Sequence, residues 1–411
     1  MSTSKRNGSQ LVKKLSSPDG VSRAEVIKEL VELGESAVPQ LIDALSDGSY
    51  RVRMAAAKAL GQIGDERAIK PLVDSISDSS KNVRRTAGGA LADIGEPAIA
   101  SLLDVLADED KTARRWAVEA LGKIGDSSVS QQLLKRLKDS NLEVRGAAIT
   151  ALGQLRSKQA IQPLISLLES ENADLPRAAA EALGKIKGTV AIQPLISALQ
   201  SPNDNVRQAA ADSLAKIGSR TVPNLLECLN SNNHYVRRYV MGILGNIGDD
   251  RAYKALIKAL DDPNDRVVRY AAIALGKLAK PAAVKYLADL VDAPSRSVRT
   301  AVAEALGYIG TYHCVQPLAK LLKDESWVTR MTAAKSLGAA ASRTAVVPLV
   351  KALQDPEWSV RLHAAQGLGQ IGQTKYAAEA LRAVLSDPRD QVQQAAADAL
   401  AKLGEEAVAT E

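Results

Sequence analysis

Arginines, carboxylates and aromatic rings recur at fixed distances from a leucine that returns every 30 to 32 residues along the sequence. An arginine stands six residues before several of these leucines, a carboxylate two before, and a ring five before or two after. Arginines bind carboxylates through charge-assisted hydrogen bonds, and rings stack on conjugated systems. The pattern therefore predicts a groove for a flat, conjugated anion; the alternative is a solvated face whose rings fill gaps between helices. We call the following positions the groove residues: Arg115, Trp116, Glu119, Asp212, Arg238, Tyr239, Arg269, Tyr270, Glu304, Tyr308 and His363.

A thiol stands beside an imidazole at His313 and Cys314, in a sequence with three histidines and two cysteines. Such a pair at the start of a helix can act as a nucleophile with a lowered pKa or as a proton-transfer pair. Neighbouring residues of a helix point about 100° apart. The alternative is therefore a buried cysteine beside an exposed histidine.

Three further rings share one position, ten residues before the recurring leucine: His234, Trp327 and Trp358. This position is a turn that enters a helix, so the three side chains should form a row along one rim of the molecule. Large amphipathic rings are enriched at protein interfaces. We expect this rim to contact a partner protein or one edge of a ligand.

The recurring leucine also defines the elements that carry these side chains. Each copy contains a Pro-Leu segment such as Ile69 to Ile76, a polar turn, and a segment such as Val52 to Ile63 with apolar residues at helical spacing. Ile-Gly pairs such as Ile63-Gly64 supply helix stops. A helical hairpin of this size cannot bury its own apolar face, so the copies must stack. The sequence predicts an all-α solenoid whose second helices carry the groove residues.

A Val-Arg pair precedes the leucine by seven residues in most copies, as in Val52-Arg53 and Val360-Arg361. We interpret this arginine as structural. Its stem can pack between repeats while its guanidinium meets an acidic turn residue or a neighbouring helix end. Function is therefore sought at positions where the repeats differ.

Composition narrows the function classes. The net charge of +6 is mild for 411 residues and lacks the dense basic tracts of a committed nucleic-acid binder. The two cysteines do not suggest a disulfide framework, and no run is apolar enough to span a membrane. We expect a cytoplasmic protein without a membrane partner. Metal-site and phosphate-loop motifs are missing, so we expect neither a metal nor a permanent cofactor.

The period implies one continuous array. We expect a frayed N-terminus over residues 1–15, a solenoid over 16–404 and a tail over 405–411. The rings, histidines and cysteines are concentrated in the second half, so the functional part is expected at about 228–376.

The motif Val-Arg-x-x-Ala-Ala-x-Ala-Leu-Gly-x-Ile-Gly, seen in Val52 to Gly64, resembles the HEAT-like repeats of phycobilisome lyases. The resemblance implies a right-handed α-solenoid (superhelix) of about 12–13 HEAT-like two-helix repeats. The length and the His-Cys pair are similar to those of the single-chain phycoerythrin lyases and lyase-isomerases of the E/F clan in cyanobacteria. Proteins of this clan attach an open-chain tetrapyrrole to a cysteine of a phycobiliprotein subunit.

The resemblance implies that phycoerythrobilin is the substrate and that a phycoerythrin subunit, expected to be α, is the partner. Arg115, Arg238 or Arg269 would pair with the bilin propionates, and Glu119, Asp212 or Glu304 would face the pyrrole nitrogens. The rings of the groove residues would stack on the pigment. Asp212, His313 and Cys314 would move protons, including those of an isomerisation to phycourobilin. Some lyase-isomerases carry Asn-His-Cys, and Tyr312 replaces the asparagine here.

Two other classes of function stay open. A non-catalytic scaffold would grip a partner protein with the rim of His234, Trp327 and Trp358. A nucleic-acid-binding solenoid would use the arginine row, but Glu119, Asp212 and Glu304 between the arginines would repel a phosphate backbone. Bilin attachment is therefore our first interpretation, a scaffold the second and nucleic acid the last.

Overall fold

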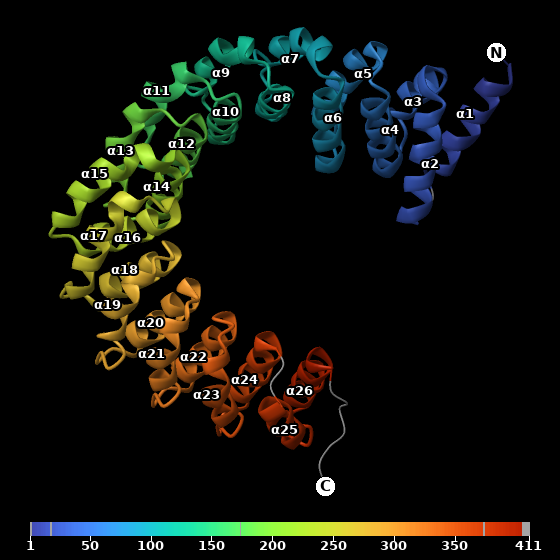
Figure 1. Cartoon of the computed structure of the whole chain (residues 1–411). Coiled ribbons are helices and arrows are strands. Elements are labelled where there is room, and N and C mark those ends of the chain that lie inside the picture. The colour runs from blue at the N-terminus through green and yellow to red at the C-terminus, as the bar shows by residue number, and fades with distance from the viewer. Residues whose placement is uncertain (1, 17–18, 173, 373–374, 405–411) are drawn as a thin grey trace. The chain divides into compact units, whose positions relative to one another are not determined.

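The computed structural model describes residues 2–16, 19–172, 174–372 and 375–404. The described residues contain helices and turns but no strand, which confirms the predicted all-α class. The chain divides into two compact units, residues 1–217 and residues 218–411. In each unit the second helices of the repeats form one layer and the shorter first helices the other (Figure 1).

The first unit begins with α1 (Ser2–Lys14) and α2 (Gly20–Glu32). Its first helices are α3 (Val38–Ala44), α5 (Ile69–Asp74), α7 (Ile99–Val105), α9 (Ser130–Arg136), α11 (Ile161–Leu167) and α13 (Ile192–Ala198). Its second helices are α4 (Tyr50–Ile63), α6 (Lys81–Ile94), α8 (Lys111–Ile124), α10 (Leu142–Gln154), α12 (Asp174–Ile186) and α14 (Asp204–Ile217).

The second unit repeats this plan. Its first helices are α15 (Val222–Glu227), α17 (Tyr253–Lys258), α19 (Val284–Ala288), α21 (Val315–Leu321), α23 (Val346–Ala352) and α25 (Lys375–Ala383). Its second helices are α16 (His234–Ile247), α18 (Asp265–Lys277), α20 (Arg296–Ile309), α22 (Trp327–Ala339), α24 (Trp358–Ile371) and α26 (Asp390–Leu403). Within each unit, successive second helices pack against one another.

The N-terminus differs from the sequence expectation. Residues 1–15 were expected to be frayed, but α1 spans Ser2–Lys14, and Leu11 and Leu15 are buried. These two leucines are four residues apart, so they lie on one face of a helix and can join the core. The tail expected at 405–411 lies outside the described residues.

The recurring leucine is buried, and the glycine that often follows it explains how closely the second helices approach. A Cβ atom placed on Gly276 would lie 2.6 Å from the Cα atom of Ala305 on the next second helix. The same holds at Gly61, whose added Cβ would lie 2.6 Å from the Cα atom of Ala90. Glycine therefore sets the spacing of the stack.

Arginines seven residues before the recurring leucine, most of them in Val-Arg pairs, form what we call the arginine ladder where they meet an aspartate of the next repeat. The guanidinium of Arg114 donates to both carboxylate oxygens of Asp139 in the next repeat, at 3.0 and 2.9 Å. Its Nη1 atom also donates to the backbone oxygens of Asp108 and Glu109, at 2.8 and 2.9 Å. The structural role predicted for this arginine is confirmed. The pairs of this kind are Arg53–Asp78, Arg114–Asp139, Arg237–Asp262, Arg299–Asp324, Arg330–Asp355 and Arg361–Asp387.

None of the described helices combines the length and the apolarity that a membrane span requires.

Candidate functional site

Two arginines and three tyrosines meet on α16 and α18 of the second unit. The guanidinium carbon of Arg238 lies 5.6 Å from the ring centre of Tyr235, 4.6 Å from that of Tyr239 and 5.7 Å from that of Tyr270. The guanidinium of Arg269 lies 4.9 Å from the ring of Tyr270. Cations at these distances are attracted by the ring faces. We call these five residues the Arg-Tyr cluster.

The Arg-Tyr cluster carries the positive charges of its two arginines. In the described ranges, neither Arg238 nor Arg269 forms an ion pair with a carboxylate. The position four residues after each arginine, which is acidic in several other repeats, holds Gly242 and Ile273. Gly242 faces the ring of Tyr270, since a Cβ there would lie 3.4 Å from that ring, in ordinary contact. Both guanidinium charges therefore stay available to an anionic ligand.

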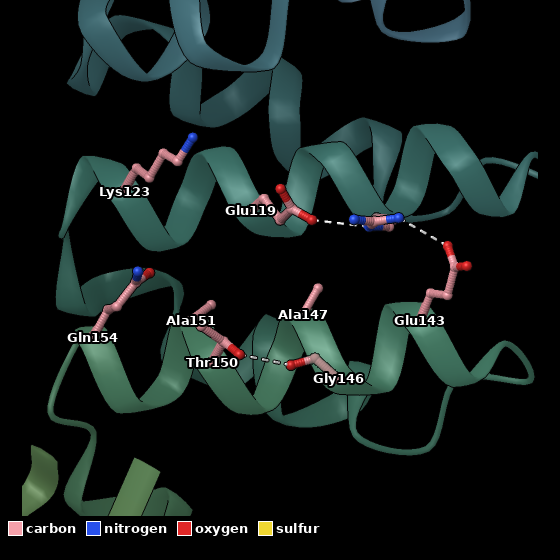
Figure 2. Close-up of a pocket in the computed structure, with 9 residues that line it drawn as sticks. Glu119, Lys123, Glu143, Gly146, Ala147, Thr150, Ala151 and Gln154 are labelled. Carbon is pink, nitrogen blue, oxygen red and sulfur yellow. Dashed lines mark hydrogen bonds and ion pairs between the residues drawn. The ribbon is translucent and has the colours of Figure 1, made fainter. Parts of the chain in front are cut away.

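The corresponding arginine of the first unit is neutralised. Arg115 on α8 donates to Glu119 of its own helix and to Glu143 of α10, each at 2.9 Å. Figure 2 shows Glu119 and Glu143, which line a cavity of about 450 Å³ together with Arg115, Thr150 and Gln154. The next arginine in the row, Arg177, lies 3.6 Å from Glu181. Arg115 thus links two repeats, and a ligand carboxylate would have to displace two protein carboxylates.

Two rings predicted to stack on a ligand are buried instead. Trp116 is only 6% exposed and packs against α6, where a Cβ on Gly88 would lie 3.6 Å from the indole. Tyr239 is 9% exposed and lies under the guanidinium of Arg238. Both residues stand five positions before the recurring leucine. At this position their side chains point into the junction with the preceding repeat. For these two residues the alternative interpretation, rings that fill gaps between helices, is correct.

The remaining groove residues are not members of the Arg-Tyr cluster and have other surroundings. Glu304 accepts a hydrogen bond from the Tyr308 hydroxyl at 3.0 Å, which raises the pKa of that exposed phenol. Asp212 is exposed and accepts from Gln208 at 2.9 Å. His363 is half-buried, and burial, together with Lys335, lowers the pKa of its imidazole.

The side chains of His313 and Cys314 do not form a pair. Cys314 is fully buried, with its sulfur 3.5 Å from Oγ1 of Thr311, whereas His313 is exposed and lies against the ring of Tyr312. They lie in a short 3-10 turn before α21, so successive side chains diverge. The geometry matches the alternative of a buried cysteine beside an exposed histidine, and a joint proton transfer has no geometric support.

The predicted rim is continuous only in part. Trp327 and Trp358 begin the neighbouring helices α22 and α24, and Trp327 is 47% exposed. His234 begins α16, where its ring contacts Tyr235 at a centroid distance of 4.3 Å. Asp265 and Arg296 hold the same position on the intervening α18 and α20. His234 therefore belongs with the Arg-Tyr cluster rather than with the tryptophans.

Sequence reasoning missed Tyr235 and Gly242. Tyr235 stands next to His234 in the turn that enters α16, outside the positions assigned to the groove. Gly242 carries no functional group, yet it faces the ring of Tyr270 one repeat later. A glycine in one repeat that lies opposite a bulky residue of the next repeat is a sequence signal for this contact. The same signal marks Gly88 and Trp116.

The geometry defines a class of protein: a helical solenoid that carries a positive, aromatic patch on the layer of its second helices. The profile of HEAT repeats matches residues 8–87, 69–141, 130–215, 161–239, 192–275, 222–306, 290–355 and 346–411. The chain is therefore a HEAT-repeat protein. No protein of curated function matches the sequence significantly.

Solved structures show the same fold at low identity. The chain is similar to Kap95p, whose structure concerns its binding of RanGDP, with a TM-score of 0.70, 14% identity, and coverage of 97% of this chain and 67% of that one. The karyopherin Kap121p bound to the C-terminus of a protein phosphatase matches with a TM-score of 0.66, 12% identity, and coverage of 97% and 54%. Importin beta matches with a TM-score of 0.59, 14% identity, and coverage of 98% and 73%. The chain thus spans about half of Kap121p, and these likenesses concern the fold alone.

Proposed function

We propose that this protein is a HEAT-repeat scaffold that binds an acidic segment of a partner protein through the Arg-Tyr cluster. The observation that carries the proposal is the pair Arg238 and Arg269, which rests on tyrosine rings without a carboxylate partner among the described residues. Arginine and tyrosine are the residue types that contribute most at protein interfaces. The karyopherin neighbour in complex with a phosphatase terminus supports a partner of this kind, by analogy of fold.

The rings pre-organise the arginines for this role. A guanidinium that lies on a ring loses less conformational freedom on binding than one on a free side chain. Tyr235 is 40% exposed, so its ring can also cover apolar parts of the bound segment. The partner segment should therefore alternate acidic with apolar side chains.

Selection from a displayed peptide library tests this proposal. The library is enriched on the wild-type protein and then screened against Arg238→Gln/Arg269→Gln and against Arg177→Gln. Arg177 is the matched control because it holds the same repeat position but pairs with Glu181. We expect acidic peptides that bind the wild type and Arg177→Gln but not the double variant. Peptides without acidic enrichment, or equal binding to all three proteins, would contradict the proposal.

We also propose a second candidate, the attachment of phycoerythrobilin to a phycoerythrin subunit. The same two arginines support it, because a bilin carries two propionates, and the half-buried Tyr270 and exposed Tyr235 offer ring faces beside them. The buried Trp116 and Tyr239, the neutralised Arg115 and the divergent His313 and Cys314 give it no support. Co-expression with phycoerythrobilin-synthesising enzymes and a phycoerythrin α subunit tests this candidate. Covalent pigment on the subunit after denaturation favours it, and uncoloured subunits reject it.

A further inference from the structure

The arginine ladder is interrupted at several repeats, and at the junction of α11, α12 and α13 in the first unit both the arginine and the aspartate are replaced. Pro176 occupies the place that Arg114 holds two repeats earlier, and Ser201 occupies the place of Asp139. The hydroxyl of Ser201 accepts from the backbone nitrogen of Asn203 at 3.3 Å, as Asp139 accepts from that of Asn141 at 2.9 Å. The serine keeps the turn but offers no carboxylate to a guanidinium.

The lost pair leaves a larger cavity. The hollows beside the intact pairs Arg114–Asp139 and Arg237–Asp262 measure about 320 and 460 Å³, whereas the hollow beside Pro176 and Ser201 measures about 680 Å³. Its walls include the apolar side chains of Ile165, Leu168 and Val206. An arginine stem packs well on such walls, as the ladder arginines do elsewhere.

The charge of the lining also changes between the two hollows. Lys135, Arg136 and Lys138 line the first hollow beside the ladder pair. In the larger cavity no lysine or arginine is part of the lining, and its charged members are Glu169 and Glu171. The larger cavity therefore favours a cation by the sign of its charge, and because both carboxylates are exposed, added salt should weaken the attraction.

Backbone acceptors complete the cavity. Nη1 of Arg114 donates to the backbone oxygens of Asp108 and Glu109. The equivalent backbone oxygens before Pro176 are those of Ser170 and Glu171, both in the lining. A guanidinium placed here would find two carbonyl oxygens and two carboxylates, a set of acceptors that suits its planar array of donors.

We propose that this cavity, which we call the arginine slot, binds an arginine side chain of a partner protein. The partner's guanidinium takes the place of the missing ladder arginine, and its stem packs on Ile165 and Val206. This interaction surface goes beyond the proposed function: it lies on the first unit, uses the opposite charge and does not depend on the Arg-Tyr cluster.

Methyl NMR of isoleucine-labelled full-length protein tests the slot. The probe is N-acetyl-arginine amide, and the control is N-acetyl-citrulline amide, which has the same shape without the charge. We expect saturable displacement of the Ile165 δ1 methyl resonance by the arginine compound alone, with the methyl of Ile309 in the second unit unmoved. No displacement, or equal displacement by citrulline, would overturn the proposal.

A variant whose own arginine side chain occupies the slot provides a second test of the proposal. Pro176→Arg with Ser201→Asp recreates the residue types of the Arg114–Asp139 pair, so it should raise the unfolding midpoint and abolish the response to the probe. Glu169→Gln/Glu171→Gln leaves the slot open and should weaken the response without changing the midpoint. A full response from both variants would exclude binding in the slot. Because Arg238 and Arg269 are untouched, this result is independent of the test of the Arg-Tyr cluster.

Discussion

At the scale of single residues, the arginine ladder separates structural from functional charges. Arg299 and Asp324 have side chains that are 9% and 5% exposed and meet at 2.6 Å. A buried ion pair contributes little compared with an apolar pair, but removing one partner leaves a buried charge. Arg238 and Arg269 have no such carboxylate partner in the described part of the chain, so their contacts with the protein are with tyrosine rings rather than with buried carboxylates.

The first prediction concerns the ladder. Asp324→Asn keeps the oxygen that accepts from the backbone nitrogen of Ser326 but removes the buried charge opposite Arg299, which then keeps only the exposed carboxylate of Glu325. We expect a loss of about 3 kcal/mol in the free energy of unfolding, measured by urea denaturation. Asp212→Asn, at an exposed carboxylate, should change it by less than about 0.5 kcal/mol. Equal effects of the two substitutions would refute a structural role for the ladder.

The second prediction concerns acid. The hydrogen bond from Arg361 lowers the pKa of Asp387 below its ordinary value in the folded protein. A carboxyl with a lowered folded pKa stabilises the protein above its unfolded pKa of about 3.9, and this contribution is lost as the pH falls below that value. Asp387→Asn should therefore lose stability at neutral pH and show a flatter decline on acidification. The measurement is the unfolding midpoint of the wild type and of Asp387→Asn, from neutral pH to below the unfolded pKa. If the two midpoints fall in parallel with pH, the Arg361–Asp387 pair is not linked to acid unfolding.

At the scale of elements, glycine controls both the spacing and the ends of the second helices. Gly276 permits contact with α20, while Gly89 in α6 has no atom within 4 Å of the place where its Cβ would stand. We expect Gly276→Ala to destabilise the protein by about 1–3 kcal/mol through overpacking. Gly89→Ala should stabilise it by about 0.5–1 kcal/mol through helix propensity. Thermal unfolding compares the two, and a stabilising Gly276→Ala would mean that the helices are not in close contact.

At two helix ends we expect substitutions to change the unfolding temperature in opposite directions. Gly310 ends α20 in the left-handed region with a φ of 62°, whereas Ala341 adopts a φ of 46° after α22. A side chain in this region costs roughly 1–2 kcal/mol. Ala341→Gly should therefore raise the unfolding temperature and Gly310→Ala should lower it. Calorimetry of both variants checks the signs, and a change of the same sign in both would contradict the argument.

At the scale of the whole molecule, the sequence predicts the features that recur in each repeat. It does not predict the exposure of side chains that lie where one repeat contacts the next. The arginine seven residues before the recurring leucine meets an aspartate of the next repeat in only some of the copies. The recurring leucine is buried in every described copy, so its helix and its role follow from periodicity. Trp116 and Tyr239 do not, because their exposure depends on what the preceding repeat places opposite them. The positive charge of Arg115 is likewise balanced in part by Glu143, one repeat away. For Arg238 and Arg269 the ligand contact stays a prediction, which is favoured by the lack of a carboxylate four residues after either arginine.

The central claim is that Arg238 and Arg269 form an anion-binding surface for a partner protein. Its most direct test is fluorescence anisotropy with a labelled peptide that alternates glutamate with alanine, and with its glutamine counterpart. We predict that the glutamate peptide binds the wild type and Arg177→Gln alike, more weakly as salt is added. Its affinity for Arg238→Gln/Arg269→Gln should be lower by roughly 10- to 100-fold, because two charge-assisted contacts are lost. Equal affinity for all three proteins, or equal binding of the glutamine peptide, would contradict the account.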